Sequence, residues 1–160
     1  MSKLDLSKLN LDELLAVASA FAHMIILKEK QSLMPTWILI NKKGETTVVT
    51  TPWSDEREKD LARKFISGQI KERKTIVYSI VVESWVAMAP EGWEPGMELP
   101  EEQQARNQVN RKEAVIAIAS NGKEKKWREW LIKRDWNEQP INLELQQKLE
   151  KPEGWMADLL

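Results

Sequence analysis

Residues 75–88 read Thr-Ile-Val-Tyr-Ser-Ile-Val-Val-Glu-Ser-Trp-Val-Ala-Met, and this stretch decides the fold class. It is rich in β-branched and aromatic residues, which favour strands. Apolar side chains occupy both alternating sets of positions, as expected for a central strand that is buried on both sides. Glu83 is the only acid within it, and a buried carboxylate needs a partner, an edge position or a chemical role. The stretch therefore predicts the middle strand of a sheet, with Glu83 as a candidate site residue.

The residues just upstream predict a β-hairpin and a helix. Strands are expected over 36–41 and 45–51, because both are rich in β-branched residues and a Lys-Lys-Gly turn separates them. A helix is expected over 54–72, since Thr51-Pro52 and the acids that follow are typical of a helix start. Its apolar stripe consists of Leu61, Phe65, Ile66 and Ile70.

An apolar helix is predicted over 11–32, beginning at a capping box formed by Asn10 and Glu13. Its middle is apolar almost all round, so one sheet could not cover it. Either its own domain wraps the helix, or the helix pairs with a second copy in a homodimer. The interface candidates of the chain are Phe21, Met24, Ile25, Trp93, Met97 and Trp155.

The same segment excludes a membrane anchor. The apolar run over 14–27 is shorter than the roughly 20 residues that a spanning helix needs. Acidic residues precede it, whereas a secretory leader would begin with basic ones. The chain also contains no cysteine, which fits a reducing compartment. We therefore expect a cytoplasmic protein that does not bind membranes.

Downstream of the central strand, the sequence predicts a long loop followed by a second hairpin. The loop covers 89–110 and is punctuated by proline and glycine. Strands are expected over 111–120 and 123–135, joined by Asn121-Gly122, a strong hairpin signal. A short helix over 143–149 is expected in the acidic tail.

Together these elements predict an α+β fold with a mostly antiparallel five-stranded sheet, an N-terminal apolar helix and a second helix packed on one face. We expect a single domain over 1–160, made of the N-terminal helix, a sheet and helix core over 36–135 and a tail over 136–160. The 24 basic and 25 acidic residues give a net charge of −1, which excludes a strong long-range field for polyanions.

A local basic segment nevertheless keeps nucleic-acid binding as an alternative. Residues 106–134 hold nine basic and three acidic residues, and tryptophans are interleaved among them. Cationic grooves with stacking indoles bind single strands with little sequence preference. A Lys/Arg strip also protects a sheet against aggregation, which explains the same residues without a ligand. The candidate residues are Lys125, Lys126, Trp127, Arg128, Trp130 and Lys133.

A metal-dependent hydrolase or nuclease is a second alternative. Glu83, Arg111 and Glu113 on adjacent strands are its weak catalytic candidates, although an Arg–Glu ladder accounts for them equally well. Glu124-Lys125-Lys126 resembles a nuclease strand but lies beside the hairpin turn. No phosphate loop, nucleophile elbow or metal-ligand spacing is present, and His23 is the only histidine. We predict no cofactor and no metal.

Two short motifs, Val82-Glu83-Ser84-Trp85 and Arg111-Lys112-Glu113, resemble a set of small uncharacterised bacterial and phage proteins. In that set a Glu-Ala/Ser-Trp strand is followed by a loop, an Arg-x-Glu strand and a hairpin with alternating aromatics. The resemblance covers residues 75–135 and implies no activity. A His-Pro-Asp element precedes the arginine there, whereas residues 107–110 read Asn-Gln-Val-Asn here. The resemblance implies an accessory protein of a phage or mobile element, which we expect to bind protein and to self-associate.

Overall fold

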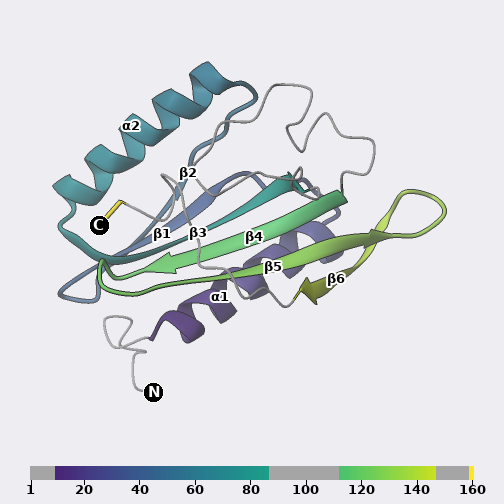
Figure 1. The fold of residues 1–160 in the computed structure, drawn as a ribbon, viewed down its shortest axis with the longest axis horizontal. Helices are drawn as coiled ribbons and strands as arrows, with labels where there is room; N and C mark the ends of the chain where they lie inside the picture. The colour runs from purple at the N-terminus through teal and green to yellow at the C-terminus, as the bar shows by residue number, and fades with distance from the viewer. Residues whose placement is uncertain (1–9, 87–111, 147–158) are drawn as a thin grey trace, which may run out of the picture.

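Six strands form one antiparallel sheet in the computed structural model, which describes residues 10–86, 112–146 and 159–160 (Figure 1). The strand order is β2-β1-β3-β4-β5-β6, and each neighbouring pair is antiparallel. The α+β class and the antiparallel sheet are confirmed. The strands are β1 (Thr36–Asn41), β2 (Thr46–Thr50), β3 (Thr75–Val86), β4 (Lys112–Ser120), β5 (Lys125–Arg134) and β6 (Pro140–Gln146), and the helical elements are α1 (Leu11–His23), its π-helical continuation η2 (Met24–Lys28) and α2 (Glu56–Glu72).

The prediction of five strands was wrong, because the chain forms a sixth strand, β6, where a short helix was expected over 143–149. Residues 140–146 read Pro-Ile-Asn-Leu-Glu-Leu-Gln, in which apolar residues alternate with polar ones. This alternation has the period of a strand, and of its three aliphatic residues Leu143 is buried whereas Ile141 and Leu145 are more than half exposed. The strand pairs with the outer edge of β5, with Leu143 opposite Ile132. The free edge of β5 therefore selects the extended form.

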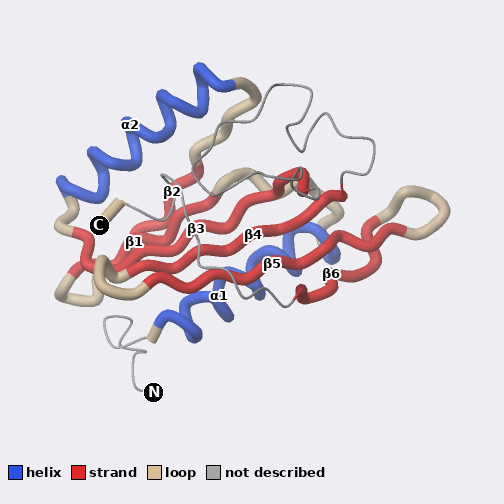
Figure 2. The backbone as a smooth tube through the Cα atoms, in the orientation of Figure 1, coloured by secondary structure: helices blue, strands red, loops and turns tan. Residues whose placement is uncertain are grey.

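The two helices lie on opposite faces of the sheet, not on one face as predicted (Figure 2). We call them the α1 face and the α2 face. Successive residues of β3 point to opposite faces, so Val77 and Val81 pack with α1, whereas Tyr78 and Ile80 pack with α2. Because β3 is apolar on both faces, it needs cover on both sides. The layering is therefore helix, sheet, helix.

Helix α1 begins as the sequence predicts. The Asn10 side chain accepts a hydrogen bond from the Glu13 amide at 2.8 Å and donates one to the Glu13 carboxylate at 3.0 Å. The residues that face the sheet are buried: Leu11, Leu14, Leu15, Ala18, Ala22 and Ile26. The helix ends at Lys28, earlier than residue 32, and its last turn widens into η2. Lys30 follows with φ 56°, a left-handed conformation that ends the helix.

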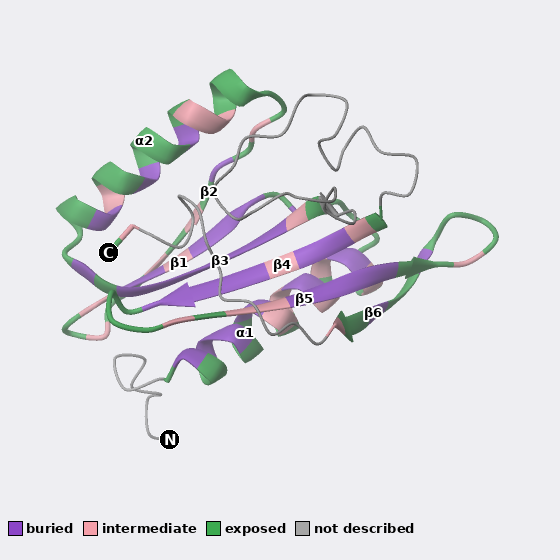
Figure 3. Ribbon diagram, in the orientation of Figure 1, coloured by how far each residue is buried: buried purple, intermediate pink, exposed green. Residues whose placement is uncertain are grey.

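Helix α2 is capped by Asp55, whose side chain accepts from the Glu58 amide at 2.7 Å. Ala62, Ile66 and Ile70 are its buried residues, and the isoleucines pack on Trp37 and Tyr78 of the sheet. Leu61 and Phe65, predicted in the same stripe, are instead more than half exposed. Much of the rest of this helix is polar and exposed (Figure 3). The predicted loop over 89–110 lies outside the described residues.

Candidate functional site

The outer side of α1 is apolar and exposed (Figure 3). Val17 is 43% exposed and Met24 is 41% exposed; Ala20 lies exposed between them, and Ala16, which precedes Val17, is also exposed. A solvent-facing helix surface normally carries polar residues. We call this set, Ala16, Val17, Ala20 and Met24, the outer α1 stripe.

The predicted interface residues divide into three groups. Met24 belongs to the outer α1 stripe. Phe21 and Ile25 are half-buried and pack against the core between α1 and the sheet, so they serve the fold as well. Trp93, Met97 and Trp155 lie outside the described residues.

Charged residues lie at both ends of the outer α1 stripe. Glu13 is exposed one turn before Val17, and Lys28 is exposed one turn after Met24. Between them, His23 is half-buried and its Nδ1 lies 2.7 Å from the Ser19 carbonyl oxygen. The stripe thus has an acidic end and a basic end.

A polar cluster of Glu83, Glu113 and Arg134 lies on the α1 face of the sheet, where β3, β4 and β5 run side by side. Arg134 binds Glu113 with two hydrogen bonds, of 2.6 and 3.2 Å. Glu83 accepts a hydrogen bond of 2.6 Å from the Leu33 amide, in the segment between η2 and β1. Burial raises the pKa of Glu83; the hydrogen bond from Leu33 and the charge of Arg134 oppose this rise only in part, and the nearby Glu113 carboxylate adds to it.

These bonds give the cluster a structural role: Glu83 ties the linker before β1 to the sheet, and Glu113 is neutralised by Arg134. Arg111, the third catalytic candidate, lies outside the described residues. Glu124 lies beside the β4–β5 turn, at the opposite end of β4 from Glu113. Within residues 10–86, 112–146 and 159–160, no three acidic or histidine side chains gather as a metal site would require. The hydrolase alternative therefore stays a prediction without a converging site.

The basic hairpin does not present its two tryptophans together. Trp130 points to the α1 face and is 5% exposed, whereas Trp127 points to the α2 face and is half-buried. Lys126 and Arg128 contact Asp12 of α1 at 2.7 and 3.3 Å, and the bond from Lys126 holds the Asp12 pKa below its usual value.

Two other cations of the hairpin, Lys125 and Lys133, are also engaged within the chain. Lys133 forms an ion pair with Glu144 of β6 at 3.4 Å. Lys125 also interacts with another group of the protein. A surface for stacking consecutive bases needs exposed rings side by side. Nucleic-acid binding stays a prediction that the placement of these side chains does not favour.

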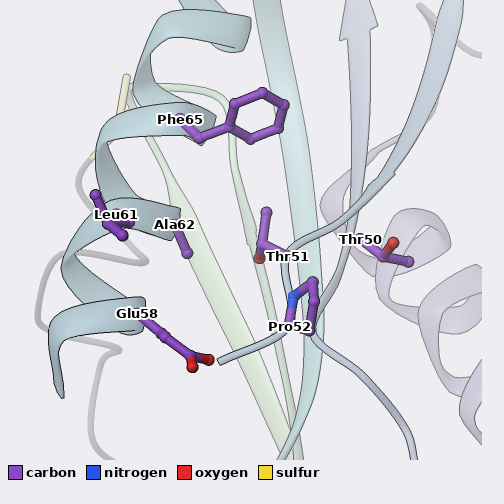
Figure 4. Close-up of a pocket in the computed structure, with 7 residues that line it drawn as sticks. All are labelled: Thr50, Thr51, Pro52, Glu58, Leu61, Ala62 and Phe65. Carbon is purple, nitrogen blue, oxygen red and sulfur yellow. The ribbon is translucent and has the colours of Figure 1, made fainter. Parts of the chain in front are cut away.

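A shallow apolar groove of about 330 Å³ separates α2 from the end of β2 (Figure 4). Leu61, Ala62 and Phe65 line it from the helix, and Thr51 and Pro52 line it from the chain that leaves β2. Glu58 lies at one end and accepts hydrogen bonds from the Ser54 amide and hydroxyl. Sequence reasoning missed this groove, although the spacing of Leu61 and Phe65, one helical turn apart, was its signal.

No family model, curated protein or solved structure matches the chain. Among the described residues, neither helix has both the length and the apolar content to cross a bilayer.

Proposed function

We propose that this protein acts by self-association, as a homodimer that pairs through the outer α1 stripe. One observation carries the proposal: Ala16, Val17, Ala20 and Met24 expose apolar surface on two consecutive helical turns, although the opposite side of the helix already fills the core. Polar residues at these positions would not disturb the core. Contact with a partner explains why they are apolar.

The stripe is complementary to itself. If two α1 helices cross antiparallel with the two-fold axis between Ala20 and Phe21, Val17 of one copy meets Met24 of the other, and Glu13 meets Lys28. A two-fold axis makes each of these contacts twice. The alanines let the helix backbones approach closely, and the charged ends favour the antiparallel orientation over the parallel one.

Met24→Lys tests the proposal, because Met24 is exposed and the substitution leaves the core intact. We expect wild type to sediment as an assembly held by this contact and Met24→Lys to lose half of its mass, with an unchanged circular dichroism spectrum. Trp136→Lys is the control: Trp136 is 89% exposed, outside the stripe, and its loss should not change the mass.

Cross-linking gives a second test, because the chain has no cysteine of its own. Ala20→Cys places one thiol near the proposed axis and should form a disulfide-linked dimer under mild oxidation. A Met24→Lys variant with wild-type mass, together with an Ala20→Cys variant that stays monomeric under oxidation, would refute pairing through α1.

A further inference from the structure

The outer edge of β2 has no partner strand among the described residues. Thr51 donates to Pro35 and Asn41 donates to Glu45, so odd-numbered residues of β2 direct their backbone groups toward β1. In an antiparallel pair the directions alternate along the strand. The N–H and C=O groups of Thr46, Val48 and Thr50 therefore point outward, as a template for another strand.

Apart from Arg73, whose guanidinium donates to the Thr47 hydroxyl at 3.3 Å, this edge lacks the usual protection against pairing. Sheet edges are commonly blocked by charged residues, proline or bulges. The opposite edge, β6, begins with Pro140 and carries Glu144. In contrast, β2 and the residue after it, 46–51, read Thr-Thr-Val-Val-Thr-Thr and carry no charge. Val48 in this strand is 61% exposed.

We propose that β2 pairs antiparallel with β2 of a second copy, with Val48 on the two-fold axis. This contact is separate from the α1 contact and goes beyond the proposed function. In this register Val48 lies opposite its own equivalent, and Thr46 lies opposite Thr50. All outward backbone groups of the strand then find partners, and the sheet continues from one copy into the next.

Charge and shape at the two ends of β2 favour a second copy as the occupant. Antiparallel pairing brings the turn that precedes β2, with exposed Lys42 and Lys43, to the groove that follows β2 in the other copy. That groove holds Glu58 at one end and the exposed Phe65 ring at the other, about two helical turns along α2 (Figure 4). Lysine fits both features, because its stem covers apolar surface while its ammonium group pairs with a carboxylate or an aromatic face.

Two isologous contacts on one chain build a closed tetramer or a longer array. Wild type should therefore have at least the mass of a tetramer by analytical ultracentrifugation. Val48→Lys, which sets two like charges against each other on the axis, should reduce the assembly to a dimer. Leu145→Lys on β6 is the matched control, since Leu145 is 55% exposed at the other edge and should leave the mass unchanged.

The combined variants separate this proposal from the α1 contact. If only the β2 contact exists, wild type is a dimer, Val48→Lys is a monomer and Met24→Lys stays a dimer. If only the α1 contact exists, these two variants exchange behaviour, and the β2 proposal is overturned. With both contacts, each variant is a dimer and the double variant Met24→Lys/Val48→Lys is a monomer.

Val48→Cys guards against an effect of the lysine on folding. Directly opposite residues of a hydrogen-bonded antiparallel pair have Cα atoms about 5.5 Å apart, within the range that a disulfide spans. We expect a disulfide-linked dimer under mild oxidation, and none for Leu145→Cys. The proposal would be overturned if wild type stays monomeric at a concentration on the order of 100 μM, comparable to the Kd of a weak dimer, and Val48→Cys forms no cross-link.

Discussion

Replacing Trp37 with phenylalanine should destabilise the fold through one buried hydrogen bond. Trp37 is fully buried in β1, and its indole N–H donates to the Thr51 hydroxyl at 2.7 Å. Its ring also lies 6.0 Å from the Tyr78 ring, centroid to centroid. Phenylalanine keeps an aromatic ring in this position but cannot donate, so it leaves the buried Thr51 hydroxyl without the indole.

Two contributions set the size of the effect. A buried hydroxyl that loses its partner costs about 1–3 kcal/mol. The smaller ring vacates roughly 40 Å³, which at about 24 cal/mol per Å³ adds about 1 kcal/mol. We therefore expect the free energy of unfolding to fall by about 2–4 kcal/mol, and the thermal midpoint of a chain of this size to fall by roughly 10 °C.

Urea unfolding followed by circular dichroism measures this loss, and a double-mutant cycle assigns it. Thr51→Val removes the acceptor at nearly constant shape and should cost about 1–3 kcal/mol, because the indole N–H then stays buried. Trp37→Phe/Thr51→Val removes both the indole N–H and the hydroxyl, so no buried polar group of this pair is left without a partner. The double variant should therefore be more stable than the sum of the single losses predicts, by about 1–2 kcal/mol. A coupling energy near zero would show that this bond does not stabilise the protein.

Three further predictions concern single side chains. Glu83→Gln keeps an acceptor for the Leu33 amide but cannot ionise. Because burial raises the Glu83 pKa, wild type loses stability as pH rises from 4.5 through the raised pKa. The variant should therefore be more stable than wild type at pH 7 and should lose this advantage below pH 4.5, which urea unfolding at several pH values measures. Asn10→Ala breaks both bonds of the capping box and should cost about 1 kcal/mol of unfolding free energy, whereas Asn10→Asp should keep most of it. Gly122→Ala forces a side chain into φ 85° and should cost about 1–2 kcal/mol by thermal unfolding, and a neutral result would mean that the turn relaxes.

Local signals in the sequence predicted most elements closely. Strand β1 has the predicted bounds, and β2 and β4 differ from theirs by a residue or so at an end. Helix α1 starts at the predicted residue because the capping box is a local feature. Helix α2 starts two residues later than expected, since Asp55 is the cap. These successes share one cause: each depends on residues within a few positions of one another.

The errors concern choices that depend on distant parts of the chain. The short segment that forms β6 was assigned to a helix because its preference is weak, and only the free edge of β5 settles it. The helices were placed on one face although the two apolar sides of β3 already indicated cover on both. The groove between α2 and β2 was not predicted, because it forms between a helix and the end of a strand. The sequence pattern of either element does not indicate that the other lies beside it.

The placement of Leu143, Ile132 and Trp130 against α1 has a consequence for synthesis of the chain. Helix α1 leaves the ribosome before β5 and β6, and three of the side chains that cover it are made more than a hundred residues later. Until then the apolar side of α1 that faces the sheet lacks part of its native cover, and such a chain is prone to aggregate or to bind chaperones. Truncation after β4 should therefore yield a nascent chain that binds such helpers, even though four of the six strands are complete.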